Sequence, residues 1–371
     1  MFPSRSYQRW VERNSSTAEE LIQQRAWADF NSDKLLISIV CPLYKTPVEI
    51  LKETIQSVSK QSYPFWELCL TLSDDESSEL RELVLQFASE DQRIRVISIE
   101  ENRGISESTN AALAEVQGTW VGFLDHDDLL TPDALYAVAK QISDDPECDL
   151  VYSDEDLISS NSRFRRSPML KPSWSPEMIV HFNYICHFVV VRRQLLKKIG
   201  GLRSEVDGAQ DWDLLLRISE QTQRIRHIPK ILYHWRELST STAAQLNAKP
   251  YVVEAQKRVL QDHFLRRGLT VDVGILRNGH CHPHWTIVDK PLVSVIIPNR
   301  DQPKLIQQVV KGIFESTDYR NVEILIVDNQ STHPDVLAYY ATIQQDYRVK
   351  VLDYSKPFNY SAACNLGAKS A

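Results

Sequence analysis

Several features that mark large classes of protein are missing from this sequence. Its six cysteines lack the regular spacing of a disulfide framework, so we expect free thiols in a reducing compartment. No apolar run approaches the length of about 18 residues that a membrane-spanning helix needs, and the first residues lack the apolar core of a signal peptide. These absences favour a cytoplasmic location and leave open a peripheral position on the inner face of a membrane.

Positive charge and glycine are also scarce. The chain has 42 lysines and arginines against 49 aspartates and glutamates, and this net charge of −7 argues against a nucleic-acid partner. Only 11 of the 371 residues are glycine, and none follows the first apolar run, where residues 41–47 read CPLYKTP. A dehydrogenase needs a glycine-rich phosphate loop at that place, and a nucleotidyltransferase needs a basic loop rich in glycine. The sequence therefore disfavours both classes of enzyme.

Strand-like and helix-like segments alternate in the first third of the chain. Apolar runs with strand character occupy residues 35–44, 66–72, 93–100 and 119–125. Helical spacing is found between them, in residues 46–61, 77–90 and 104–118. The alternation predicts an α/β fold with a mostly parallel central sheet flanked by helices. In such a sheet, ligands bind beyond the carboxyl ends of the strands.

The pattern changes on either side of this region. Further strands are expected at residues 149–158, 187–193 and 224–236. Further helices are expected at residues 209–221 and 251–268. Near the N-terminus, residues 16–30 predict a helix with Ser16 as its cap.

An internal repeat indicates how the chain is divided. LVSVIIPNR (292–300) resembles LISIVCPLY (36–44), and residues 359–371 resemble residues 104–113. The counterpart of the strand end at Asp125 would fall beyond Ala371. We expect four parts: an N-terminal helical extension (1–34), a complete domain (35–268), a linker (269–290) and a partial second copy (291–371).

The stretch VGFLDHDDLLTPDAL (121–135) ends a strand in a concentration of negative charge. Asp125, Asp127 and Asp128 follow the apolar run directly, and a helix is expected to begin at Thr131. Asp-x-Asp on a tight turn offers hard oxygen ligands, which suit Mg²⁺ or Mn²⁺. Such a cation would let the acidic turn bind a diphosphate. A solvated acidic cap at a helix start is the plainer alternative.

Taken together, the segments resemble a family of sugar-transferring enzymes. The order of motifs over residues 37–236 is that of the family: ISIVCPLYKTP, YPFWELCL, NRGISESTNAAL, FLDHDDLLTPDAL, DLVYSDEDLI, KPSWSPEMIV, GAQDWDLLLRISEQ and IRHIPKILYHWR. The chain resembles tandem family 2 glycosyltransferases with the GT-A fold, of the kind linked to bacterial O-antigen and other surface polysaccharides. Residues 291–371 resemble the start of the same domain, which implies a truncated second copy.

The resemblance implies a metal site and a catalytic base. Asp125, Asp127 and His234 would hold Mn²⁺ or Mg²⁺, which neutralises the leaving nucleotide diphosphate. Asp211 matches the base that removes the proton from the acceptor hydroxyl in an inverting reaction. The acidic segment YSDED (152–156) is expected to line the acceptor side.

The resemblance also implies a nucleotide-sugar site at the same strand ends. Its residues would be Pro42, Tyr44, Asp74, Asp75, Asn102, Gly104, Asn110, Asp125, His126 and Arg236. Asp74 and Asp75 match the position that recognises the base and ribose, and extra residues before them leave open which one reaches the base. Carboxylates accept hydrogen bonds from uracil and thymine alike, so UDP- and dTDP-linked donors both stay open.

The expected function is inverting, metal-dependent transfer of a sugar from a UDP- or dTDP-linked donor to a saccharide or lipid-linked acceptor. The alternative is a non-catalytic sugar-nucleotide-binding or scaffold module of a polysaccharide assembly complex. The intact residues Asp125, Asp127 and Asp211 argue against that alternative. The sequence leaves open whether the chain forms a homo-oligomer.

Overall fold

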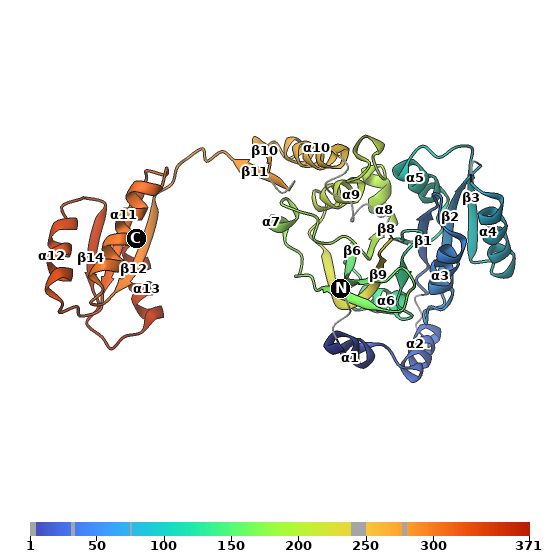
Figure 1. The fold of residues 1–371 in the computed structure, drawn as a ribbon, viewed down its shortest axis with the longest axis horizontal. Helices are drawn as coiled ribbons and strands as arrows, with labels where there is room; N and C mark the ends of the chain where they lie inside the picture. Colours follow the sequence, from blue (N-terminus) through green and yellow to red (C-terminus); the bar gives the residue numbers. More distant parts are fainter. Residues whose placement is uncertain (1–4, 31–33, 75, 239–249, 277–279) are drawn as a thin grey trace. The chain divides into compact units, whose positions relative to one another are not determined.

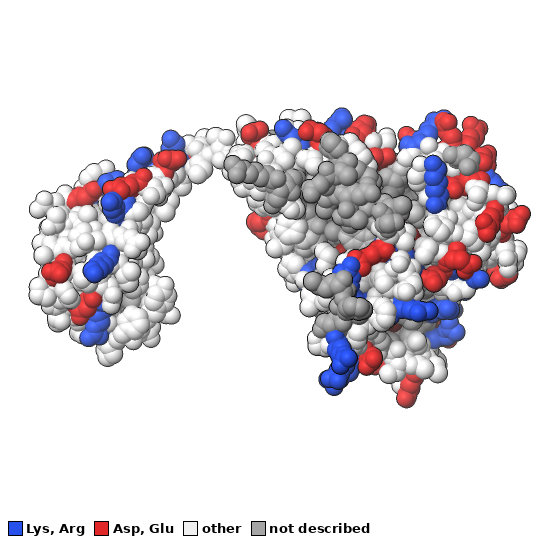
Figure 2. All heavy atoms as spheres, in the orientation of Figure 1, with Lys and Arg blue, Asp and Glu red and all other residues white. Residues whose placement is uncertain are grey.

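The computed structural model (Figure 1) describes residues 5–30, 34–74, 76–238, 250–276 and 280–371. The chain forms two compact units, Met1–Trp285 and Thr286–Ala371, and each has a hydrophobic core of its own. No helix in these described ranges is both long and apolar enough to cross a lipid bilayer. On the face drawn in Figure 2, each unit carries acidic and basic side chains interspersed with one another.

The first unit is built on a nine-stranded sheet. Its strands are β1 (Ile37–Pro42), β2 (Trp66–Ser73), β3 (Ile94–Ile99), β4 (Trp120–Phe123), β5 (Leu129–Leu130), β6 (Leu150–Ile158), β7 (Arg165–Met169), β8 (Val189–Arg192) and β9 (Ile225–Arg236). The order is β3-β2-β1-β4-β8-β6-β9-β5, with β7 paired to β6. Strands β1 to β4 are parallel, whereas β8 runs antiparallel to both neighbours, β4 and β6. The amino end of β8 therefore lies at the same edge as the carboxyl ends of β4 and β6.

Helices cover both faces of this sheet (Figure 1). One face packs against α2 (Ala18–Phe30), α3 (Val48–Ser59), α4 (Ser78–Glu90) and α6 (Ala134–Asp144). The other packs against α5 (Ile105–Glu115), α8 (Arg193–Ile199), α9 (Gln210–Ser219) and α10 (Pro250–Arg266). Side chains alternate along a strand, so Ile39 of β1 enters the first core and Val40 the second. This three-layer arrangement confirms the predicted α/β class.

Helices α1 (Arg5–Asn14) and α2 precede the sheet, and the predicted cap of α2 is wrong by one residue. Thr17 Oγ1 accepts the N–H of Glu20 at 3.2 Å, and Glu20 Oε2 accepts the N–H of Thr17 at 2.7 Å. This reciprocal pair is a capping box. Ser16 instead donates its hydroxyl to Asp133 Oδ2 at 2.6 Å, which attaches the extension to the sheet domain.

Helix α6 begins at Ala134, later than the predicted start at Thr131. Thr131 Oγ1 donates to Asp133 Oδ1 at 2.7 Å, and this contact holds a turn before the helix. Asp133 Oδ2 also accepts the ammonium of Lys230. Asp133 therefore connects three segments and does not cap α6 with its side chain.

Residues 269–290, expected as a linker, contain an antiparallel hairpin of β10 (Val271–Ile275) and β11 (Cys281–Trp285). Val273 and Cys281 are buried in the same core as α10. Two short elements complete the first unit, α7 (Pro176–Ile179) and the 3₁₀ turn η1 (Ser204–Val206).

The second unit has a parallel sheet of three strands in the order β12 (Val293–Asn299), β13 (Val322–Asp328) and β14 (Val349–Asp353). Its helices are α11 (Pro303–Ser316), α12 (Pro334–Ile343) and α13 (Tyr360–Ser370). The strands and helices alternate along the chain, as the repeat predicts.

Candidate active site

A cavity of about 560 Å³ opens at the carboxyl ends of the central strands. Pro42, Asp125, His187, Asp211 and Trp235 line it, each from a different segment of the first unit. Most other lining side chains are apolar, including Phe123, Phe182, Trp212, Leu214, Leu215 and Val252. A concave, largely apolar site with a few convergent polar groups is the usual form of a small-molecule site.

The acidic turn after β4 is fixed by β9. Asp128 is fully buried, and its two carboxylate oxygens accept the hydroxyl of Tyr233 at 2.5 Å and the N–H of Arg236 at 2.7 Å. The N–H of Asp128 donates to the carbonyl of Asp125 at 3.2 Å, which closes the turn. The turn is therefore held rigidly enough to direct its remaining carboxylates.

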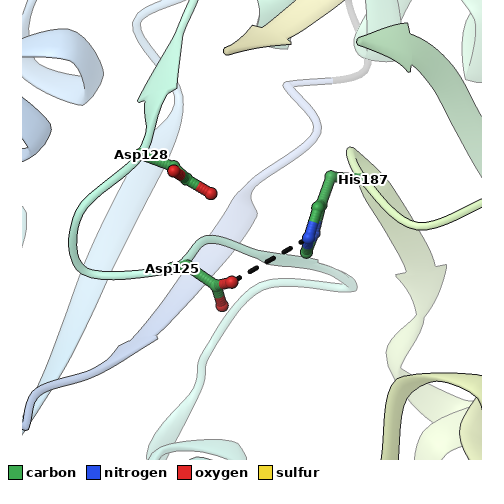
Figure 3. A group of neighbouring side chains, drawn as sticks. All are labelled: Asp125, Asp128 and His187. Carbon is green, nitrogen blue, oxygen red and sulfur yellow. Dashed lines mark ion pairs between the residues drawn. The ribbon is translucent and has the colours of Figure 1, made fainter. Parts of the chain in front are cut away.

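Asp125, Asp128 and His187 form the one group of potential metal ligands found among the described residues, with ligand atoms within 4.8 Å of one another (Figure 3). His187 Nε2 lies 3.9 Å from Asp125 Oδ2. The His187 ring stacks on Tyr233, with centroids 4.6 Å apart. Two carboxylates and one imidazole are a donor set that Mn²⁺ accepts well.

Burial shapes the protonation of the acidic turn. Burial raises the pKa of Asp127, and it raises the pKa of Asp128 well above the usual range. The nearby charge of Asp125 raises the pKa of both carboxyl groups further. Like charges held this close are stabilised by a cation, so the electrostatics of the turn also fit a metal site.

Asp211, the predicted catalytic base, lines the same cavity at the start of α9. Its Oδ2 accepts the amide of Asn183 at 2.9 Å. Burial raises the pKa of Asp211, while the charge of His187 lowers it and that of Asp125 raises it. The fold thus brings together Asp125 and Asp211, which are far apart in sequence.

His234, a predicted metal ligand, faces away from this cavity. Side chains alternate along β9, so Tyr233 and Trp235 contact His187 while His234 does not. His234 Nδ1 lies 2.6 Å from Asp156 Oδ1, and burial lowers the pKa of its ring. The histidine that lies beside Asp125 is His187, which the sequence pattern did not single out, and the metal role of His234 stays a prediction without support from this geometry.

Asp127 lies outside the ligand group, although its backbone helps to fix the turn. Its carbonyl accepts Arg236 Nε at 2.6 Å, and its carboxylate is 4.0 Å from His126 Nδ1. Neither Asp127 nor His126 lines the cavity. Their predicted roles in metal and nucleotide binding stay predictions.

Arg236, predicted to contact the diphosphate, is fully buried. Besides the contact with Asp127, its guanidinium donates to Glu53 Oε2 at 2.8 Å, to Ser162 Oγ at 2.5 Å and to the carbonyl of Ser160 at 3.2 Å. These contacts use four of the five N–H donors of the guanidinium, and the predicted contact with the diphosphate stays a prediction. The geometry supports a structural role for Arg236 in holding the acidic turn.

Some of the predicted nucleotide-binding side chains are exposed, and others are hydrogen-bonded within the protein. Pro42 lines the cavity. Tyr44 follows the end of β1 and Asp74 follows the end of β2, and both side chains are exposed. Asp74 Oδ1 accepts Arg81 at 3.2 Å. Asp75 lies outside the described residues.

The two predicted asparagines are occupied by the protein itself. Asn102 Oδ1 accepts the N–H of Gly104 at 2.9 Å, and Gly104 begins α5 with a φ of +108°. A side chain at Gly104 would be strained at that φ, so the glycine is needed for the backbone. Asn110 makes two hydrogen bonds of 2.9 Å to the backbone of Leu202. These contacts give both asparagines a structural role, and their predicted contact with the nucleotide stays a prediction.

The segment YSDED does not line this cavity, and the expectation that it lies on the acceptor side stays a prediction. Its three acidic residues lie on β6 and are buried: Asp154 pairs with His227, Glu155 with Lys171, and Asp156 with His234 and Arg165. Residues from α10 and the hairpin, among them Gln256 and Cys281, line part of the cavity.

Comparison with known proteins identifies the class to which this fold and site belong. The Staphylococcus aureus protein TarS (residues 1–349, solved with UDP-GlcNAc) resembles this chain in fold, with a TM-score of 0.51 and 20% sequence identity over 62% of this chain and 67% of that one. The fold is of the GT-A type, with a curled, mostly parallel sheet between layers of helices.

The sequence match is more specific. The model of glycosyl transferase family 2 matches residues 38–200 and 294–371, so the chain belongs to glycosyltransferase family 2. An uncharacterized protein of Sinorhizobium fredii, y4gI, is 39% identical over 89% of this chain and 37% of its own length. The O-antigen biosynthesis protein RfbC of Myxococcus xanthus is 36% identical over 92% of this chain and 26% of its own length. The chain thus spans well under half the length of either relative.

Proposed function

We propose that this chain is an inverting glycosyltransferase that moves a sugar from a UDP- or dTDP-linked donor to a saccharide or lipid-linked acceptor of bacterial surface polysaccharide synthesis. One observation carries the proposal: a single cavity is lined by Asp125 and His187, two potential metal ligands, and by Asp211, a partly buried carboxylate. The family membership and the similarity to an O-antigen biosynthesis protein support it.

The donor set of the acidic turn fits a divalent cation, for which we propose Mn²⁺ or Mg²⁺. Asp125 and His187 would hold it, with Asp128 as the third group. Both oxygens of Asp128 already accept a hydrogen bond, so Asp127 is the competing third ligand. When bound, the cation would neutralise the diphosphate of the leaving group.

The chain's own residues would do the remaining work. Asp211 would accept the proton of the acceptor hydroxyl, and burial moves its pKa in the direction that makes it a better base. Asn183 would orient that carboxylate through its hydrogen bond to Oδ2. Pro42, at the end of β1, would contact the nucleotide, since it lines the same cavity as Asp125.

We also propose that residues 291–371 are a partial second copy of the domain at 35–268, with residues 269–290 between them. The strand registers support this, because Ile37 pairs with Trp66 in β1–β2 and Val293 with Val322 in β12–β13. The pattern of polar contacts is repeated as well. Ser38 donates to Glu67 at 2.5 Å and Ser294 donates to Glu323 at 2.7 Å.

Calorimetric titration of UDP and dTDP, each with and without Mn²⁺, tests the function. Wild type should bind one nucleotide in a metal-dependent way, and Asp125→Asn should lose that dependence. Hydrolysis of the matching sugar nucleotide then separates the alternatives. Binding with slow hydrolysis that Asp211→Asn abolishes supports the enzyme, whereas binding with no hydrolysis and no transfer to any saccharide acceptor supports the scaffold module. Absence of binding by wild type would contradict both.

A further inference from the structure

Residues 183–187 form a short segment before β8, and both of its ends contact the candidate active site. At one end, Asn183 Nδ2 donates to Asp211 Oδ2 at 2.9 Å. At the other, His187 Nε2 lies 3.9 Å from Asp125 Oδ2. The position of this segment therefore sets the position of two groups that the proposed reaction uses.

A buried lysine holds the backbone of this segment. Lys171 lies between β7 and α7, and its side chain is only 2% exposed. Its Nζ donates to the backbone carbonyls of Ile185 and His187, and to Glu155 Oε2 at 3.0 Å. An ammonium group has three protons, so these three acceptors use all of them.

Glu155 of β6 binds the same residue from the sheet. Its Oε2 accepts the N–H of His187 at 2.9 Å in addition to the ammonium of Lys171. Its side chain is fully buried, and its Oε1 has no hydrogen-bond partner within the described part of the chain. His187 thus has its N–H and its carbonyl oxygen bound by the two halves of one ion pair.

Stability alone does not explain a buried ion pair of this kind. Removing two charges from water costs about as much as their attraction returns, and an apolar pair of similar volume is often as stable. An apolar pair, however, could not make directed hydrogen bonds to the backbone of Ile185 and His187. What the charged pair adds, and an apolar pair could not, is a fixed orientation of the backbone at residues 183–187.

We propose that Lys171 and Glu155 are positioning residues, which fix His187 toward Asp125 and thereby set the affinity of the site for a divalent cation. The inference rests on the proposed function, because it takes His187 as a metal ligand. Stacking on Tyr233 fixes the plane of the His187 ring, and the ion pair fixes the backbone that carries it. Both restraints act on a residue that touches neither the donor sugar nor the acceptor in this account.

The test is calorimetric titration of Mn²⁺ into the full chain, with thermal unfolding measured in parallel. Glu155→Gln should weaken Mn²⁺ binding about 10- to 100-fold, as is typical when the partner of a metal-ligating histidine is removed. Lys171→Met should weaken it similarly and lower the melting temperature, because it leaves Glu155 as an unpaired buried charge. The double variant Lys171→Met/Glu155→Leu should regain melting temperature relative to Lys171→Met and still bind Mn²⁺ weakly.

Glu67→Gln is the matched control. Glu67 of β2 is also a buried carboxylate, paired with Arg95 at 3.0 Å and accepting the N–H of Gln117 at 2.5 Å, but it lies at the amino ends of the strands. Its replacement should lower the melting temperature and leave Mn²⁺ affinity unchanged. Equal loss of affinity in Glu67→Gln and Glu155→Gln would overturn the inference, and so would unchanged affinity in Glu155→Gln.

Two further outcomes separate this inference from the proposed function. If wild type binds no Mn²⁺, the metal site of the proposed function fails and the positioning role fails with it. If wild type binds Mn²⁺ and His187→Ala binds it equally well, metal binding by the acidic turn stands, while the ligand role of His187 and the positioning role are overturned.

Discussion

The two halves of the large sheet contribute different things to the candidate site. In the parallel half, β1 to β3, the buried polar contacts lie at the amino ends, where Glu67 joins Ser38, Arg95 and Gln117. Asp74, the residue that follows the carboxyl end of β2, is exposed. In the mixed half, the buried pair of Glu155 and Lys171 contacts His187, which lines the cavity.

The candidate site thus combines exposed side chains from the parallel half with residues of the mixed half that the protein itself holds in place. The parallel half offers exposed side chains that a nucleotide can contact without disturbing the core. The mixed half holds His187 through Lys171, Glu155 and Tyr233, so its geometry is set before any ligand arrives. Changes in the mixed half should therefore alter chemistry and metal affinity, and changes in the parallel half should alter nucleotide affinity or stability.

The largest expected effect is that of Asp211→Asn. Removing the proposed base should lower kcat about 10²- to 10⁴-fold, because general base catalysis contributes on that scale. Metal-dependent nucleotide binding should be retained, since Asp211 is not among the grouped ligands. Steady-state transfer or donor hydrolysis measures the first, and calorimetry the second. Full activity in the variant would assign the base elsewhere.

A pair of histidine variants separates the two faces of β9. His187→Ala should weaken Mn²⁺ binding by at least about 10-fold, because even the outer partners of metal ligands have effects of that size. His234→Ala should leave Mn²⁺ binding unchanged and lower stability by about 1–3 kcal/mol, because Asp156 loses a buried hydrogen bond. Titration of Mn²⁺ and chemical denaturation give the two quantities. The reverse pattern would restore His234 as the ligand.

The pH dependence of kcat/KM should show an acid limb set by Asp211. The base acts when deprotonated, and burial raises its pKa, so the rate should fall as pH falls through that raised pKa. The limb should lie above pH ~3.9, the usual value for aspartate, with about a tenfold loss for each further pH unit. The residual activity of Asp211→Asn should lack the limb. An identical limb in that variant would attribute it to another group.

The smallest effect expected on function is that of Asn110→Ala. The change removes two hydrogen bonds to the backbone of Leu202, which should cost about 1–3 kcal/mol of stability. Nucleotide affinity should not change, because the amide is already bound within the protein. Denaturant unfolding and nucleotide titration on the same samples provide the check. A selective loss of nucleotide affinity would show that Asn110 reaches the ligand after all.

Sequence reasoning succeeded where local pattern decides the structure. Alternating apolar strands and amphipathic helices predicted the parallel half. The acidic run after β4 and the helix that begins at Gln210 marked two segments that meet in the cavity. The rule that ligands bind at carboxyl strand ends needs only the strand order along the chain, which the sequence displays.

Sequence reasoning failed for residues whose place depends on the direction of a strand or on the face of the strand that they occupy. His187 precedes a strand, so it was not expected at a carboxyl-end edge, and only the antiparallel direction of β8 brings it there. His234 and Arg236 lie on β9, where both faces are buried and apolar periodicity cannot assign a side chain to a face. Asn110 could not be assigned because its partner, Leu202, is remote in sequence.

The hairpin of β10 and β11 has a practical consequence for anyone who dissects this chain. The family match in the first unit ends at residue 200, yet Asp211, Trp235 and Cys281 all line the cavity and all follow that point. A fragment cut where this family-model match stops would lack the proposed base and one wall of the pocket. The shortest piece that preserves the whole enclosure runs to Trp285, the last residue of β11.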